Sequence, residues 1–159
     1  MGIASFNWQR MKHIQKLHCV LYALGLGPII GRIILLLTTV GRKTGLKRVT
    51  PLQYEEMGGK YYLGSARGIQ SDWVRNIQCN PQVEVRVKSL CFSGRAEIVT
   101  EPGRVADFIE MRLQRHPFMI GTIMRRAHGL PQHPSREQLE RLAEKEALVI
   151  ITPVPFSEN

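Results

Sequence analysis

The sequence predicts an α+β domain of about six mostly antiparallel strands, with helices at the ends and along one side. Three observations support this class: short β-rich apolar segments separated by glycine turns, one strictly alternating segment, and helical spacing of apolar residues in the last third. With 159 residues, of which 43% are hydrophobic, the chain is long enough for one hydrophobic core. We therefore expect a single domain over residues 1–159.

The chain up to residue 100 is expected to consist mainly of strands. Strands are expected over residues 33–39, 48–54, 61–65, 83–87 and 91–100, with a last one over 148–151. The glycines of Gly41–Gly45 and Met57–Lys60 allow tight turns, so the first three strands are expected to follow one another as a β-meander. Val83, Val85 and Val87 alternate with charged residues, which is typical of a half-exposed strand.

Helices are expected in four places: after Ser71, after Glu101-Pro102, over residues 118–127 and after Ser135. Ser71 is a suitable N-cap for the first helix, which Asn80-Pro81 ends. The pair His116-Pro117 separates the second helix from the third. Ser135 and Gln138 form a capping box for the fourth.

The N-terminal segment is apolar and needs separate treatment. Residues 17–37 are nearly all apolar and follow a basic stretch, as in a signal peptide or a membrane span. Two glycines and a proline within residues 25–28 break this run, and Arg32 interrupts it, which argues against both. We expect an N-terminal helix within residues 1–28. Peripheral membrane contact by the basic, amphipathic start of this helix stays open as an alternative.

Charge is the unusual feature of the composition. The formal net charge is +9 and the sequence pI is about 9.9, so the surface should attract nucleic acid, acidic lipid or a polyanionic cofactor. No nucleic-acid reader motif is present, so nucleic acid is not expected as a partner. The three cysteines and five histidines lack metal-ligand spacing, so no metal site is expected. Scattered, unpaired cysteines favour a cytoplasmic location.

The loop Gly41–Gly45 has the composition of an anion-binding turn. Its glycines free backbone N–H groups, and Thr44 adds a hydroxyl. Arg42 and Lys43 add positive charge, and Arg48 follows on the next strand. Such a turn can surround a phosphate with N–H groups, and arginine can contact a phosphate through two hydrogen bonds. A solvated hairpin turn uses the same residue types, so the loop alone leaves both interpretations open.

A second group of candidate residues lies at Ser65–Gly68 and in the helix that follows. Small residues end the strand there and leave its backbone accessible, and Arg67 offers a further contact to an anion. Trp73 can pack against a planar ring, although a lone tryptophan on an apolar helix face is more often part of the core. No serine-hydrolase, metalloprotease or paired-acid motif is present. This pattern favours an enzyme whose cofactor supplies the reactivity.

The two groups together resemble the signature of the deazaflavin-dependent nitroreductase family. The matching residues are 36–45, Arg48 and Pro51-Leu52 in the first block, and 65–68, 72–77 and Asn80-Pro81 in the second, within about residues 30–100. The resemblance implies a split β-barrel, similar to that of the pyridoxamine-phosphate-oxidase-like flavin-binding proteins. It also implies that the cofactor is the deazaflavin coenzyme F420.

The resemblance assigns a role to each candidate residue. The residues expected to hold the phosphate and the acidic tail of the coenzyme are Lys43, Thr44 and Arg48, with Arg42 in the same loop. Those expected beside the ring are Pro51 and Leu52 on one side and Ser65, Ala66 and Arg67 on the other, supported by Trp73 and Asn76. His116 and His128 are candidate groups on the substrate side, in a segment that departs from the family's pattern.

The predicted function is hydride transfer from reduced coenzyme F420 to a small organic acceptor, such as an enone, a quinone or a nitro compound. One alternative is an FMN-binding reductase of the same fold. An alternative of another class is a non-catalytic carrier of a coenzyme or haem. By analogy with barrels of this type, a homodimer is expected.

Overall fold

The computed structural model describes residues 33–155, and within this range the chain folds into one curled sheet and four α-helices. The strands are β1 (Ile34–Val40), β2 (Lys47–Gln53), β3 (Glu55–Met57), β4 (Lys60–Ser65), β5 (Gln82–Val87), β6 (Leu90–Val99) and β7 (Ala147–Pro153). The helices are α3 (Asp72–Cys79), α4 (Pro102–Arg115), α5 (Pro117–His128) and α6 (Arg136–Ala143), with a short 3-10 helix, η2, at Gly68–Gln70.

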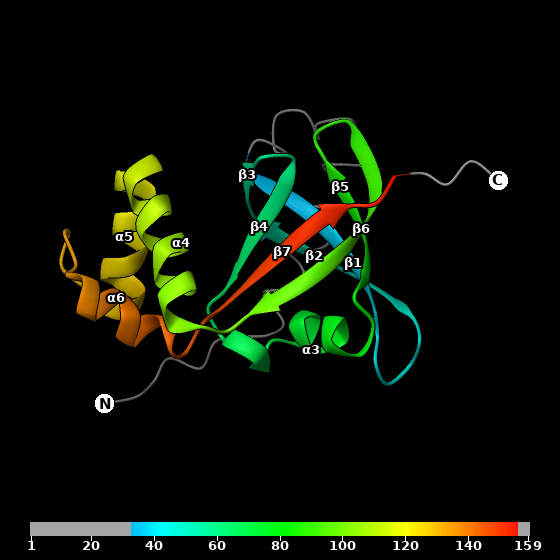
Figure 1. The fold of residues 1–159 in the computed structure, drawn as a ribbon, viewed down its shortest axis with the longest axis horizontal. Helices are drawn as coiled ribbons and strands as arrows, with labels where there is room; N and C mark the ends of the chain where they lie inside the picture. The colour runs from blue at the N-terminus through cyan, green and yellow to red at the C-terminus, as the bar shows by residue number, and fades with distance from the viewer. Residues whose placement is uncertain (1–32, 156–159) are drawn as a thin grey trace.

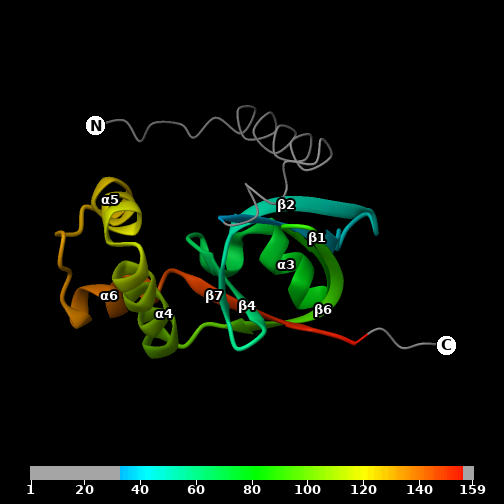
Figure 2. The same ribbon diagram turned by 90° about the horizontal axis from the view of Figure 1, so that it is seen from above.

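The seven strands form one antiparallel sheet in the order β2-β1-β5-β6-β7-β4-β3. The sheet curls into a half-barrel, and Figure 2 shows α3 enclosed by its curve. Tyr54 alone separates β2 from β3 along the chain, although these strands lie at opposite ends of the strand order. The chain therefore crosses the gap of the barrel at Tyr54 without closing it through strand pairing, as in a split barrel.

Helix α3 closes the barrel because one of its faces is apolar. Trp73 and Val74 lie about one turn before Ile77 on this face, and all three are buried in the core that the inner side of the sheet surrounds. Ser71 is the N-cap residue, as predicted, but its hydroxyl makes no capping hydrogen bond and pairs with the Ser65 hydroxyl instead, at 2.8 Å. The helix is thus tied to the end of β4.

A second core lies on the other side of β7, where α4, α5 and α6 pack beside the barrel (Figure 1). Val149 and Ile151 of β7 face the barrel core, whereas Leu148 and Ile150 face the helices. This explains why residues 148–151 of β7 show no alternation of polar and apolar residues, since a strand buried on both faces is apolar throughout.

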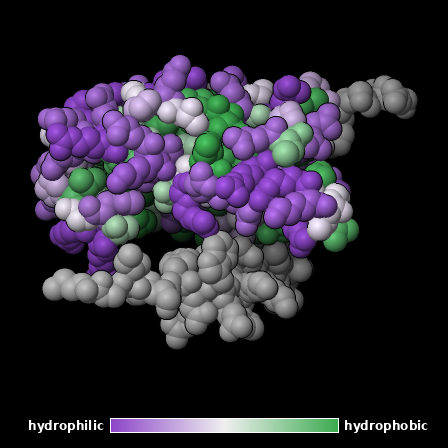
Figure 3. Space-filling model, turned by 90° about the horizontal axis from the view of Figure 1, so that it is seen from below, coloured by the Kyte–Doolittle hydropathy of each residue, from purple (hydrophilic) through white to green (hydrophobic). Residues whose placement is uncertain are grey.

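Seen from below, the molecule is mainly hydrophilic, and hydrophobic surface gathers in the middle of this face (Figure 3).

The predicted fold class is confirmed: about six strands were expected and the described residues form seven, because the short strand β3 pairs with β4 across the Gly58-Gly59 turn. One expectation about the strand order was wrong. Three strands were expected as a meander, but only β1 and β2 are neighbours, and β4 pairs with β3 and β7. Local turn signals identify hairpins, whereas the partner of β4 comes from more than 80 residues further along the chain.

Other expectations about local structure are confirmed. The Ser135–Gln138 capping box begins α6, and His116 separates α4 from α5. Both glycines of the second turn have positive φ angles, 57° and 74°, as such a turn requires. The predicted N-terminal helix and its membrane contact lie outside the described residues. Within residues 33–155, none of the helices has the length and hydropathy needed to span a membrane.

Candidate functional site

The loop Gly41–Gly45 is a tight connection between β1 and β2. The N–H of Gly41 donates to the carbonyl of Leu46 at 2.8 Å, and the N–H of Gly45 donates to the carbonyl of Gly41 at 2.7 Å. A Cβ on Gly41 would lie only 3.0 Å from the Leu46 oxygen, and Gly45 has a φ of 68°. Both glycines are therefore needed for this loop shape. The Thr44 hydroxyl accepts from the Leu46 N–H at 3.3 Å.

Helix α3 anchors the loop through Asn76. The side-chain oxygen of Asn76 accepts from the backbone N–H of Arg42 at 3.2 Å and from its guanidinium at 3.1 Å. The amide nitrogen of Asn76 donates to the Thr39 hydroxyl at 3.1 Å. Arg42 also forms an ion pair with Asp72 at 3.0 Å. Arg42 and Asn76 thus fix the position of the loop relative to the barrel.

Two of the four cations around the loop have no acidic partner among the described residues. Arg42 pairs with Asp72, and Lys47 pairs with Glu84 at 2.7 Å. Lys43 and Arg48 are exposed, and neither forms an ion pair within residues 33–155. The backbone N–H groups of Lys43 and Thr44 also donate to no other described residue. The loop therefore offers an anion two positive charges and two backbone donors.

Strand β2 continues from this loop toward a cavity at the other end of the strand. It is the first strand in the sheet order, so its outer edge has no strand partner within the described residues. The cavity has a volume of about 380 Å³ and is lined by Ile33, Gln53, Tyr54, Glu55, Arg112, Arg115, His116, Pro117, Phe118 and Met119. Lys47 and Gln53 lie roughly 20 Å apart along an extended strand. The loop and the cavity are thus the two ends of one open edge.

The carboxylate of Glu55 lies at the polar side of this cavity and has three cationic or imidazole neighbours. Its side chain is only 7% exposed, and it lies 3.5 Å from Arg112 Nε, 3.3 Å from Arg115 Nη1 and 3.1 Å from His116 Nε2. Arg112 also donates to the side-chain oxygen of Gln53 at 2.9 Å. His116 was predicted as a substrate-side group and does line this cavity.

Sequence analysis missed Glu55, Arg112 and Arg115. One signal was available: Arg112 follows Phe108 by four residues and Ile109 by three, so it lies on the buried face of α4. An arginine on such a face indicates a buried acidic partner. Nothing in the sequence shows that this partner is Glu55, which is more than 50 residues away.

Comparison with protein families decides the assignment. Residues 23–118, more than half of the chain, match the family described as F420H(2)-dependent quinone reductase. The chain belongs to this family. It is an F420H2-dependent reductase, and its cofactor is coenzyme F420. The expected resemblance to a deazaflavin-dependent family is confirmed, with a family description that names quinones as acceptors.

Solved structures support the split-barrel fold of this reductase. An F420H2-dependent reductase (FDR-A) is 22% identical, with 75% of this chain and 94% of that chain covered and a TM-score of 0.50. A protein from Listeria innocua described as a pyridoxamine 5′-phosphate oxidase is 14% identical, with 87% and 94% covered and a TM-score of 0.54. A structure described as a domain-swapped dimer is 22% identical, with 85% and 95% covered and a TM-score of 0.51.

The second group of predicted residues in the reductase, at the end of β4 and in α3, has mainly a structural role. The Ser65 hydroxyl is buried and bonds to the Gly68 carbonyl at 2.8 Å, in addition to its contact with Ser71. Trp73 is 8% exposed and part of the core, which confirms the core interpretation of this residue. Ala66 and Arg67 are exposed at the end of β4.

The predicted ring contacts on β2 divide between its two faces. Successive residues of a strand point to opposite sides, so Pro51 and Leu52 do not share a face. Leu52 is partly buried and packs against the barrel core. Arg48 lies on the same face as Leu52, opposite Thr39 in register. A coenzyme along β2 would therefore approach Pro51 and Leu52 at the edge of the strand.

His128, the other predicted substrate-side residue, lies away from the 380 Å³ cavity. Its Nε2 is 3.7 Å from Glu146, the residue just before β7. Burial raises the pKa of Glu146 to about 7, and the positive charge of Arg112 opposes this rise. Burial lowers the pKa of Arg112, and Glu55 is the main group that opposes this. The structure thus separates the two predicted histidines and gives each a glutamate partner.

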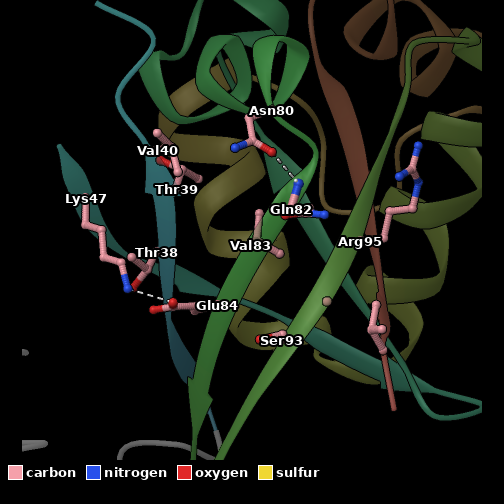
Figure 4. Close-up of a pocket in the computed structure, with 12 residues that line it drawn as sticks. Thr38, Thr39, Val40, Lys47, Asn80, Gln82, Val83, Glu84, Ser93 and Arg95 are labelled. Atoms are coloured by element: carbon pink, nitrogen blue, oxygen red, sulfur yellow. Dashed lines mark hydrogen bonds and ion pairs between the residues drawn. The ribbon is translucent and has the colours of Figure 1, made fainter. Parts of the chain in front are cut away.

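The larger cavity of the reductase, about 480 Å³, lies beside the base of the loop (Figure 4). Its lining comes mainly from β1, β2, β5 and β6 and includes the polar side chains of Thr38, Lys47, Gln82, Glu84 and Arg95, but neither Lys43 nor Arg48. Lys47 reaches across to Glu84 there, and the Asn80 side chain accepts from the Gln82 N–H at 3.1 Å. The one lysine of this cavity is therefore neutralised by Glu84, whereas Lys43 and Arg48 at the loop form no ion pair within residues 33–155.

Proposed function

We propose that the protein transfers hydride from reduced coenzyme F420 to a quinone-type acceptor, with the coenzyme along the open edge of β2. The observation that carries this proposal is the arrangement of β2, with two unpaired cations at one end and a cavity at the other. The donor set fits a coenzyme with a phosphate and an acidic tail, because Lys43, Arg48 and two free N–H groups gather at the loop.

Each residue of the loop has a defined task in this proposal. Lys43 and Arg48 bind the phosphate, and the Thr44 N–H adds a hydrogen bond. Arg42 and Asn76 keep the loop in one position, so that little ordering is needed on binding. Bound in this way, the reduced deazaflavin ring supplies the hydride, and the protein supplies binding and orientation.

The other predicted contacts follow from the same placement. Pro51 and Leu52 lie beside the ring at the edge of β2, and Ser65, Ala66 and Arg67 form the opposite wall at the end of β4. Trp73 supports this wall from within the core. The acceptor occupies the 380 Å³ cavity, where Tyr54, Phe118 and Met119 provide apolar walls.

Titration with coenzyme F420 and, separately, with FMN tests the coenzyme site. Lys43→Ala and Arg48→Ala are each expected to weaken F420 binding about tenfold, because each removes a charge-assisted hydrogen bond. Lys60→Ala is the matched control, since Lys60 is an exposed lysine with no ion pair among the described residues. Fluorescence of the deazaflavin gives the affinities.

Unchanged affinity in both loop variants would contradict the proposed site. Tighter binding of FMN than of F420 would favour an FMN reductase of the same fold, and a co-purified haem band would favour a carrier. The homodimer and the contact of the N-terminal helix with membrane stay predictions, which light scattering and vesicle flotation would test.

A further inference from the structure

The polar side of the 380 Å³ cavity carries an excess of positive charge. Among the described residues that line it, Glu55 is the one carboxylate, and it faces both Arg112 and Arg115. One carboxylate neutralises one guanidinium. The other acid near Arg112 is Glu146, whose pKa burial raises to about 7, so near neutral pH it carries only part of its charge. Glu146 does not line the cavity, so the two arginines and one carboxylate that do line it carry a net positive charge.

Arg112 and Arg115 differ in how many hydrogen bonds they make and in how exposed their side chains are. Arg112 has a side chain that is 15% exposed, donates to both Glu55 and Gln53, and lies 5.7 Å from the centre of the Phe108 ring. Arg115 makes one hydrogen bond within the described residues, from Nη1 to Glu55 at 3.3 Å, and its side chain is 44% exposed. Both arginines thus share the carboxylate of Glu55, and Arg115, the more exposed of the two, retains donors for a ligand in the cavity.

The remaining walls of the cavity are apolar. Tyr54 is buried, and Phe118 and Met119 at the start of α5 are exposed large hydrophobic residues. A site with apolar walls and one cationic side suits a planar apolar molecule that carries an anionic or strongly polarised oxygen. Arg115 can donate a charge-assisted hydrogen bond to such an oxygen while the apolar walls contact the rest of the molecule.

We propose that Arg115 binds the carbonyl oxygen of the acceptor and stabilises the negative charge that develops on it during reduction. This proposal rests on the proposed function. Hydride addition to an enone or quinone forms a C–H bond and moves the π-electron pair of the acceptor onto the carbonyl oxygen, which becomes an enolate or phenolate. One proton from solvent completes the two-electron reduction, and the reduced coenzyme is oxidised. Arg115 is held ready for this charge by Glu55, which acts as a positioning residue.

The proposal predicts that the cavity prefers anionic to neutral naphthoquinones even without coenzyme. The probes are an acidic hydroxynaphthoquinone, which is anionic at neutral pH, and its methyl ether, which is neutral and similar in shape. Isothermal titration of the coenzyme-free protein gives both affinities. The wild-type protein is expected to bind the anion about tenfold more tightly than the ether, because Arg115 makes a charge-assisted hydrogen bond with the anion.

Three variants test the assignment. Arg115→Gln is expected to reduce the preference to about threefold or less, and Arg115→Lys is expected to retain most of it, since the charge is kept. Arg104→Gln is the matched control, because Arg104 is a similarly exposed arginine at the other end of α4, paired with Glu97. Its preference is expected to equal that of the wild type.

Retention of the full preference in Arg115→Gln would overturn the proposal, as would an equal loss in Arg104→Gln or no preference in the wild type. These titrations contain no coenzyme, so they are independent of the coenzyme titrations of Lys43→Ala and Arg48→Ala. A failed coenzyme site and a failed acceptor contact therefore give different results.

Discussion

Asn76 shows how one buried amide can fix the geometry of an exposed loop. It uses three hydrogen bonds, two accepted from Arg42 and one donated to Thr39, and it is only 4% exposed. An aspartate there would lose the donor, and an alanine would leave the Thr39 hydroxyl and the Arg42 N–H without their partner. Asn76 thus fixes the backbone of Arg42, directly before Lys43 in the loop.

Glu146 is the residue for which the structure predicts a clear pH effect. Burial raises its pKa from 4.5 to about 7, the positive charge of Arg112 opposes this rise, and the imidazole of His128 lies 3.7 Å away. A raised pKa means that the folded state binds the proton more readily than the unfolded state. The Glu146 side chain therefore contributes most to stability below pH 4.5, where it is protonated. The folded protein loses that contribution as the pH rises toward and through 7, because the buried group must then lose its proton.

Glu146→Gln is expected to remove this pH dependence, since glutamine resembles the protonated acid. The variant should be more stable than the wild type at pH 8, by at most about 3 kcal/mol, and the difference should shrink toward pH 5. Urea denaturation at several pH values measures it. Glu144→Gln, at an exposed position two residues earlier, is the control, and parallel pH profiles for wild type and Glu146→Gln would contradict the prediction.

At the scale of elements, the sequence predicted the features that depend on neighbouring residues. The alternation of β5, the glycine turns, the Ser135–Gln138 capping box and the break at His116-Pro117 all depend on residues within a few positions of one another. The loop Gly41–Gly45 was predicted as an anion site for the same reason. The pairing of β4 with β7 and the contact between Glu55 and Arg112 join distant segments. Single-sequence patterns carry no signal for such pairings.

Gly68 joins β4 to α3 in a conformation that other residues adopt at a cost. Its φ is 56°, and a Cβ would lie 2.7 Å from the Lys145 carbonyl oxygen, just before β7. Gly68→Ala is expected to destabilise the protein by about 2 kcal/mol or more, because it adds backbone strain and a contact with fixed backbone. Gly103→Ala in α4 is the control, since a Cβ there meets nothing within 4 Å.

The two alanine variants should move in opposite directions. Gly103→Ala is expected to stabilise the protein by about 0.5 kcal/mol, as alanine is the better helix former. The midpoint of urea denaturation shows both changes. If Gly68→Ala were as stable as Gly103→Ala, the close approach of η2 to the start of β7 would be wrong.

At the scale of the whole molecule, the net charge of +9 has two possible effects on an anionic coenzyme. A general field attracts the coenzyme to the whole surface, and local contacts hold it at one place. Both weaken with salt, but they depend on different residues. Any exposed lysine contributes to the general field, whereas only Lys43 and Arg48 contribute to the local contacts proposed for the loop.

Salt dependence therefore separates the two effects. Affinity for coenzyme F420 is expected to fall as ionic strength rises from 0.01 to about 0.15 M, because the screening length shortens from about 30 to about 8 Å. The double variant Lys43→Ala/Arg48→Ala should bind more weakly at low salt and lose much less affinity on adding salt. Lys60→Ala should follow the wild-type curve, since it lowers the general field alone. If Lys60→Ala flattened the curve as much as the double variant does, the attraction would belong to the surface as a whole, and the loop would not be the specific site of binding.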